Sequence, residues 1–215
     1  KAAIEYPANF SKLSSTKRKA PPTPRPHQSE ALDAVEKGFA ENDRGQLLMA
    51  CGTGKTYTTL WIKELIKAQS TLVLVPSLSL LSQTLREWTF AANESFEVLC
   101  VCSDETVGKK TGQDEIIQSV HDLSFPVTSN VDEIKDFLQG KDSKVIFSTY
   151  QSSPIIAQAQ RANNAKIFDL VIADEAHRCT GEAGSAFTTV LDDTLIKARR
   201  RLFATATPKT YTANH

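Results

Sequence analysis

The sequence predicts an α/β domain with a mostly parallel central sheet flanked by helices. Short apolar runs alternate with longer segments whose apolar residues recur at helical spacing, and strands that alternate with helices in this way form βαβ units. A glycine-rich turn also follows one apolar run and precedes a helical segment. Open parallel sheets bind their ligands at such turns. The 215 residues are enough for one large domain and a tail.

Residues 1–24 are predicted to form a linker or N-terminal arm, and residues 25–215 the folded domain. The arm has no sustained hydrophobic period, and the proline-rich segment Pro21–Pro26 closes it; proline lacks a backbone donor and restricts the residue before it. The basic triplet Lys17–Lys19 could contact a phosphate backbone, although a solvated tail is the more ordinary interpretation. A helix is predicted after Pro26 from the spacing of three apolar residues: Leu32, Val35 and Phe39.

The remaining elements follow from apolar runs and amphipathic segments. The predicted strands are Leu47–Ala50, Thr71–Val75, Glu97–Cys102, Lys144–Ser148, Leu170–Asp174 and Arg201–Thr205. The predicted helices are Lys55–Ala68, Leu78–Ala92, Val131–Leu138 and Ser185–Ile196. Residues 103–142 are the least regular and are predicted to be an insertion or an edge region.

Composition narrows the class of protein. Lys plus Arg and Asp plus Glu each number 25, so net charge offers no global attraction to nucleic acid, although a local basic stripe can suffice. The four cysteines show no C-x-x-C spacing, which favours a reduced protein without structural zinc. No apolar run approaches the roughly 20 residues that cross a bilayer, and no signal peptide is visible. We therefore expect a cytoplasmic protein without a membrane partner.

The turn at residues 49–56, Met-Ala-Cys-Gly-Thr-Gly-Lys-Thr, is predicted to hold a polyphosphate. A glycine-rich turn that opens a helix points backbone N–H groups and the helix dipole at one place. Lys55 would reach the β- and γ-phosphates, and the Thr56 hydroxyl would bind Mg²⁺. The general pattern has glycine at the position of Met49, but the strand–turn–helix setting favours the nucleotide site over a chance turn. Its expected residues are Gly52, Thr53, Gly54, Lys55 and Thr56.

A carboxylate pair, Asp174 and Glu175, ends another predicted strand. Asp174 could bind Mg²⁺ directly or through water, while Glu175 could position and deprotonate the attacking water. Such a pair alone is usually a solvated turn, but a phosphate loop at the same sheet edge favours catalysis. For the nearby His177 we prefer a hydrogen bond to a neighbouring loop over a role as general base or metal ligand.

Arg25 and Gln28 are individually weak signals at the start of the first helix. A glutamine amide can pair with the donor and acceptor of adenine, but on the residues alone Gln28 is more often an ordinary polar residue in a first helical turn.

Taken in order, these residues resemble the first RecA-like domain of superfamily 2 helicases and translocases of the DEAH-box type. The resemblance covers residues 25–208 and rests on Arg25–Gln28, Ala50–Thr56, Val75–Ser77, Ser148–Gln151, Asp174–His177 and Thr205–Thr207. Within that superfamily the sequence most resembles the motors of restriction–modification enzymes, on the phrases 49–56, 75–83 and 148–152. The superfamily does not require the leading glycine, so Met49 is compatible with it.

The resemblance implies an ATP-fuelled, Mg²⁺-dependent motor, with Arg25 and Gln28 at the adenine. It implies sequence-independent contacts from Pro76, Ser77 and Thr149 to a nucleic-acid strand, and coupling of nucleotide state to strand grip by His177, Thr205 and Thr207. It also implies a second RecA-like domain outside residues 25–215 that supplies arginine fingers. Arg199–Arg201 do not replace them, because they lead into the last strand of this domain, so we expect the segment alone to be weakly active.

The expected function is therefore the ATP-binding motor domain of a DNA translocase or helicase. The resemblance implies a bacterial restriction–modification enzyme whose nuclease or methyltransferase regions accompany the motor, acting on double-stranded DNA. The alternatives are an RNA helicase domain, against which the residues after Val75 argue, and a nucleotide-dependent switch module without motor activity.

Overall fold

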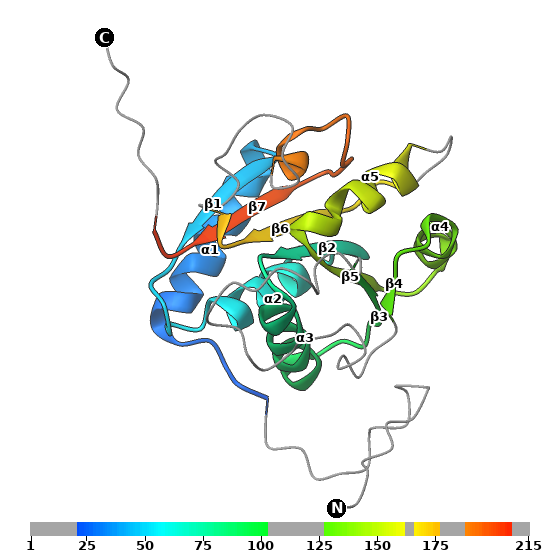
Figure 1. Ribbon diagram of the computed structural model, residues 1–215. Helices are drawn as coiled ribbons and strands as arrows, with labels where there is room; N and C mark the ends of the chain where they lie inside the picture. Colours follow the sequence, from blue (N-terminus) through cyan, green and yellow to red (C-terminus); the bar gives the residue numbers. More distant parts are fainter. Residues whose placement is uncertain (1–20, 103–126, 162–165, 177–187, 208–215) are drawn as a thin grey trace, which may run out of the picture.

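A single parallel sheet forms the centre of the molecule (Figure 1). The computed structural model describes residues 21–102, 127–161, 166–176 and 188–207. Within them a seven-stranded sheet has the order β1-β7-β6-β2-β5-β3-β4, and its neighbouring strands are parallel. The strands are β1 (Arg44–Leu48), β2 (Ser70–Val75), β3 (Glu97–Val101), β4 (Val127–Thr128), β5 (Lys144–Thr149), β6 (Leu170–Asp174) and β7 (Arg201–Thr205). The α/β fold with a parallel sheet is confirmed.

Helices cover both faces of this sheet (Figure 1). They are α1 (Pro26–Glu41), α2 (Lys55–Leu65), α3 (Leu78–Ala91), α4 (Val131–Gln139) and α5 (Ser153–Gln160), with 3₁₀ turns η4 (Tyr150–Ser152) and η6 (Thr189–Leu191). Alternate residues of β2 face opposite layers: Val73 and Val75 belong to the core beneath α1, α2 and α3, whereas Leu72 and Leu74 belong to the core beneath α4 and α5. No helix in the described residues is long and apolar enough to span a membrane.

The layer containing α2 and α3 also fixes the start of α2. Trp88 of α3 is fully buried and meets the ring of Phe147 edge to face, with centroids 5.4 Å apart. Its indole N–H donates to the carbonyl of Thr56 at 3.0 Å, which gives this large apolar ring the polar partner that a buried indole needs. The first turn of α2 is therefore anchored to the core.

The predicted bounds are accurate in the centre of the sheet and less so elsewhere. The bounds of β6 and β7 are those predicted. Strand β1 lies earlier than predicted because the carbonyl of Ala50 already accepts from the N–H of Thr53 in the turn after it. Helix α2 ends at Leu65 rather than Ala68, since Lys67 adopts a left-handed backbone with φ of 54°. The sequence did not predict α5 or the short β4 at the sheet edge. Residues 103–126 of the irregular stretch lie outside the described residues.

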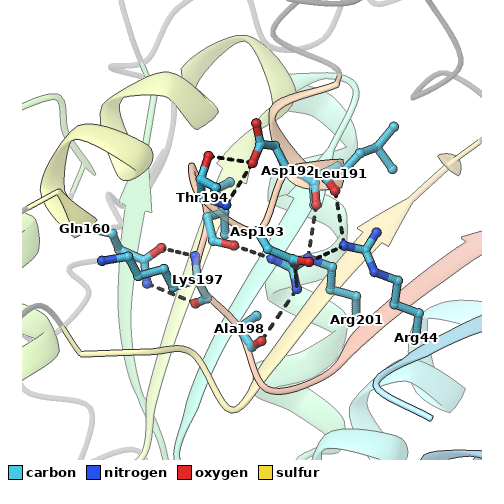
Figure 2. A network of polar contacts seen from close by, with 11 residues as sticks. Arg44, Gln160, Leu191, Asp192, Asp193, Thr194, Lys197, Ala198 and Arg201 are labelled. Atoms are coloured by element: carbon cyan, nitrogen blue, oxygen red, sulfur yellow. Dashed lines mark hydrogen bonds and ion pairs between the residues drawn. The ribbon is translucent and has the colours of Figure 1, made fainter.

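The predicted helix Ser185–Ile196 is wrong over its described part, residues 188–196. Only η6 and turns form there, because other groups bind the carbonyls that a helix would use. The guanidinium of Arg201 donates to the carbonyls of Val190, at 3.1 Å, and Ile196, and Arg44 donates to the carbonyl of Leu191 at 3.1 Å. Figure 2 shows this network at the connection between β6 and β7.

Candidate nucleotide-binding site

The carboxyl ends of five neighbouring strands form one edge of the sheet. Strand β1 ends at Leu48, β7 at Thr205, β6 at Asp174, β2 at Val75 and β5 at Thr149. The predicted phosphate loop, the carboxylate pair and the predicted nucleic-acid contacts all lie at these ends or directly after them. The parallel topology thus gathers segments that lie far apart in the sequence at the edge where such sheets bind ligands.

The turn between β1 and α2 has the conformation that its glycines allow. Gly52 and Gly54 have φ of 75° and 89°, values that a residue with a Cβ rarely adopts. Thr53 closes the turn, since its hydroxyl donates to the carbonyl of Ala50 at 2.7 Å. A Cβ added at Gly54 would collide with the amide of Gln28, whereas one added at Gly52 would meet nothing within 4 Å. The backbone of Gly52 is therefore open to close approach by a ligand, beside the N-terminus of α2.

Lys55, the first residue of α2, faces the carboxylates at the end of β6. Its ammonium lies 2.9 Å from Asp174 Oδ1 and also contacts Glu175 Oε1. Burial raises the pKa of Asp174, and the charge of Lys55 opposes that shift. Burial lowers the pKa of Lys55, but its charge and hydrogen-bond interactions with Asp174 and Glu175 outweigh burial and raise it overall. Predicted phosphate-binding and Mg²⁺-binding groups are therefore in direct contact.

Glu175 adopts an unusual backbone conformation, with φ of 52°. A residue with a Cβ is disfavoured in this left-handed region, so the turn needs support. The Glu175 N–H donates to Asp174 Oδ1 at 2.9 Å, and the phenol of Tyr150 donates to the Asp174 carbonyl at 2.7 Å. Tyr150 is not among the site residues predicted from the sequence, although it stands directly beside Thr149 in a motif that carries the resemblance.

Gln28 lies under the phosphate loop. Its side chain is 3% exposed, and its amide nitrogen donates to the carbonyl of Gly54 at 3.1 Å and to the hydroxyl of Thr58 at 3.2 Å. Its amide oxygen accepts from the backbone N–H of Arg25, a residue whose side chain is exposed. Adenine recognition by Arg25 and Gln28 stays a prediction, while the observed contacts tie α1 to the loop. His27 adds a further tie, 3.0 Å from the carbonyl of Thr53.

The predicted nucleic-acid contacts divide into two groups. Pro76 and Ser77 are half-buried after β2, and the Ser77 hydroxyl accepts from the N–H of Leu80 at 3.3 Å as the cap of α3. Thr149 is only 1% exposed, and its hydroxyl donates inward to Ser152 Oγ at 3.1 Å. The hydroxyl of Thr149 thus points into the protein here, and its contact with nucleic acid stays a prediction.

The described residues of the predicted coupling set, Thr205 and Thr207, lie near the phosphate loop. The carbonyl of Thr205 accepts from the N–H of Met49 at 3.1 Å, which joins the end of β7 to the start of the loop. The Thr205 hydroxyl also accepts from the N–H of Thr207 at 3.2 Å and so closes a small turn. His177 lies outside the described residues.

Sequence comparison assigns the family. The family described as "Type III restriction enzyme, res subunit" (ResIII) matches residues 22–210. The chain belongs to this family. A curated relative, Probable helicase A859L of African swine fever virus (isolate Tick/Malawi/Lil 20-1/1983), is 35% identical to this ResIII chain over 186 residues. The match covers 86% of this chain and 19% of the relative. A second isolate of that virus, Pig/Kenya/KEN-50/1950, gives 34% identity over the same coverage, so the chain spans about a fifth of the relatives' length.

Solved structures agree with this assignment. The ResIII chain is similar to the ATP-dependent Type ISP restriction–modification enzyme LlaBIII bound to DNA, with 35% identity and a TM-score of 0.77 over 96% of this chain and 14% of that one. It is similar to a nuclease-deletion mutant of the Type ISP enzyme LlaGI with a DNA substrate mimic, with 36% identity and a TM-score of 0.70, over 88% and 18% of the two chains. The Sulfolobus solfataricus SWI2/SNF2 ATPase core, 19% identical with a TM-score of 0.55 over 89% of this chain and 33% of that one, shares the fold.

Proposed function

We propose that this ResIII chain is the first RecA-like motor domain of an ATP-dependent DNA translocase or helicase. The contact between Lys55 and the Asp174–Glu175 pair carries the proposal, because it joins the three groups that phosphoryl transfer to water requires. In this proposal Lys55 binds the β- and γ-phosphates. Asp174 and the Thr56 hydroxyl would hold Mg²⁺, and Glu175 would accept a proton from the attacking water.

The site fits a magnesium nucleotide. The turn presents an open glycine backbone at Gly52 and the N-terminus of α2, which together suit a phosphate group. The carboxylate of Asp174 and the hydroxyl of Thr56 are the hard oxygen ligands that Mg²⁺ prefers. When bound, Mg²⁺ would neutralise phosphate charge, so that Lys55 need not do so alone.

Likeness to restriction enzymes solved with DNA supports DNA as the partner. We propose that Pro76, Ser77 and Thr149 line the DNA path, and that Thr205, Thr207 and His177 couple it to the nucleotide. A second RecA-like domain would complete the site, and nuclease or methyltransferase regions would accompany the motor. Adenine selection by Arg25 and Gln28, and a cytoplasmic location in a bacterium, stay predictions.

Two substitutions test this function in the full-length protein. Lys55→Ala and Glu175→Gln should each abolish DNA-stimulated ATP hydrolysis, because one removes a phosphate ligand and the other the proton acceptor. Phosphate release with and without duplex DNA measures the effect. Lys37→Ala and Glu36→Gln, which change exposed residues of α1, are matched controls. Undiminished turnover in either site variant would refute the assignment, and stimulation by RNA but not DNA would favour the RNA helicase alternative.

The 215-residue chain alone should hydrolyse ATP slowly. If arginine fingers come from the second domain, their absence lowers turnover by about 10³-fold or more. Steady-state ATPase assays of this chain and of the full-length protein, each with DNA, measure the difference. Comparable rates per site would show that this domain needs no second one.

A further inference from the structure

Tyr150 lies between the proposed DNA contacts at the end of β5 and the proposed catalytic carboxylates at the end of β6. We propose that Tyr150 is a positioning residue that transmits DNA engagement at the end of β5 to the Asp174–Glu175 turn. This inference rests on the proposed function and assigns a role to a residue for which that function gives none. Tyr150 would touch neither DNA nor nucleotide, and would act through the backbone of Asp174.

The connection spans the end of an intervening strand. Strands β5 and β6 lie on opposite sides of β2, and the last pairs of β2 with them are Val75 with Thr149 and Leu74 with Ala173. Immediately beyond these pairs, the phenol of Tyr150 reaches the carbonyl of Asp174 at 2.7 Å. It therefore crosses the point where the chain leaves β2 for the proposed DNA contacts Pro76 and Ser77.

The hydrogen bond from Tyr150 holds the peptide group between Asp174 and Glu175, the two proposed catalytic carboxylates. The carbonyl of Asp174 and the N–H of Glu175 belong to the same rigid peptide plane. The Tyr150 phenol binds one side of this plane, and the Asp174 carboxylate binds the other at 2.9 Å. Because Glu175 has φ of 52°, rotation of this plane would redirect its side chain, and relaxation to negative φ is the intrinsically preferred outcome. The phenol of Tyr150 thus helps to aim the proposed proton acceptor.

The other end of the connection lies in the proposed DNA contact. Tyr150 directly follows Thr149, is fully buried and begins η4. The Thr149 hydroxyl donates to Ser152 at the end of the same turn. A shift of this turn on DNA binding would carry the phenol of Tyr150 with it, since buried groups cannot move independently of their neighbours.

Tyr150→Phe in the full-length protein removes the hydroxyl and keeps the ring. DNA-stimulated kcat should fall about fivefold to tenfold, the factor carried by one hydrogen bond, and kcat without DNA should fall by less. KM for ATP and the Kd for DNA should stay within about twofold. Tyr57→Phe is the matched control, because it removes a phenol from α2 that stacks on Trp61 and leaves the Asp174 turn intact. Its stimulation by DNA should equal that of the wild type.

If the Tyr150 hydroxyl only stabilised the fold, Tyr150→Phe would change the kinetics and stability in a different way. Equal losses of kcat with and without DNA, or a lowered melting temperature with unchanged stimulation, would overturn the proposal. Thr149→Val is a second variant, at the other end of the connection, and it should also lower the stimulation of ATP hydrolysis by DNA. The double variant should lose no more of this stimulation than the more affected single variant. Additive losses would contradict a shared connection. A wild-type protein whose ATPase ignores DNA would instead refute the proposed function, and this inference with it.

Discussion

Lys55 and Lys63 lie on the same helix, are both largely removed from solvent and have pKa shifts of opposite sign. Burial lowers the pKa of Lys63, and the more distant Glu94 and Glu64 do not restore it. Burial also acts on Lys55, but two carboxylates in direct contact reverse the result. The Lys63 ammonium has only the hydroxyl of Ser143 at 3.1 Å and the ring of Phe96 at 5.4 Å as close partners among the described contacts. A charge at Lys63 therefore opposes folding.

Replacing Lys63 with Met should remove that penalty. Below the lowered folded-state pKa, the folded protein buries a charge that water solvates in the unfolded chain, so the variant should be as stable as the wild type or more so. As pH rises through the folded pKa toward 10.5, the unfolded chain binds more protons and the wild type gains relative stability. Urea unfolding from pH 7 to 10.5 measures this, with exposed Lys37→Met as control. A difference independent of pH would contradict the buried-charge account.

At this scale the sequence predicts contacts that the chain topology imposes. Lys55 meets Asp174 because both stand at the carboxyl edge of one parallel sheet, and motif spacing is enough to foresee that. The inward direction of Gln28 could not be foreseen, since it depends on how closely α1 packs against the phosphate loop. The hydrogen bond from the Tyr150 phenol could not be foreseen either, because its acceptor is the Asp174 carbonyl on the far side of β2.

Among the elements, the sequence predicts those whose burial leaves a plain pattern. Strands β2, β5 and β6 are buried along their whole length, so unbroken apolar runs reveal them. Strand β1 lies at the edge with only one buried residue, and the predicted strand begins only at Leu47 because residues 44–46 are not apolar. Helix α5 contains a proline and two glutamines, which obscure its period. Its buried residues Ile156 and Ala157 belong to a core that α4 and η6 share, so its burial depends on neighbours far away in the sequence.

The end of α2 offers an element-scale prediction. Lys67 is exposed and has φ of 54°, while the N–H of Ala68 bonds back to the carbonyl of Lys63 at 3.1 Å. Helices commonly end in this geometry with glycine at the left-handed position. Lys67→Gly should therefore raise the free energy of unfolding by about 0.5–1 kcal/mol, since relief of strain outweighs the added freedom of the unfolded chain.

Urea unfolding of Lys67→Gly against Lys67→Ala measures this gain, because alanine removes the side chain without allowing the left-handed backbone. Equal stability of the two variants would show that the backbone at this position carries no strain.

At the scale of the whole molecule, the connection from β6 to β7 leads from the carboxylate turn to the predicted coupling residues, and its described residues 188–200 form η6 and turns rather than a regular helix. Arg201 begins β7 with a side chain that is 1% exposed, and its guanidinium binds the carbonyls of the connection as well as Asp193 (Figure 2). Gln160 of α5 fixes the same connection through two bonds to the backbone of Lys197. Since β7 ends beside the phosphate loop, order in this connection supports the position of the site.

Arg44 and Arg201 both form ion pairs with Asp193 but differ in burial. Substituting each one therefore measures how burial changes an arginine's contribution to the free energy of unfolding. Arg44 also binds Asp193, at 2.8 Å, but its side chain is 37% exposed. Arg44→Gln should lower the free energy of unfolding by at most about 1 kcal/mol, as exposed ion pairs do. Arg201→Gln should cost about 3–5 kcal/mol, because it leaves buried carbonyls without donors and cannot replace the guanidinium. Urea unfolding of both variants tests the contrast, and similar small losses would show that the connection holds its shape without Arg201.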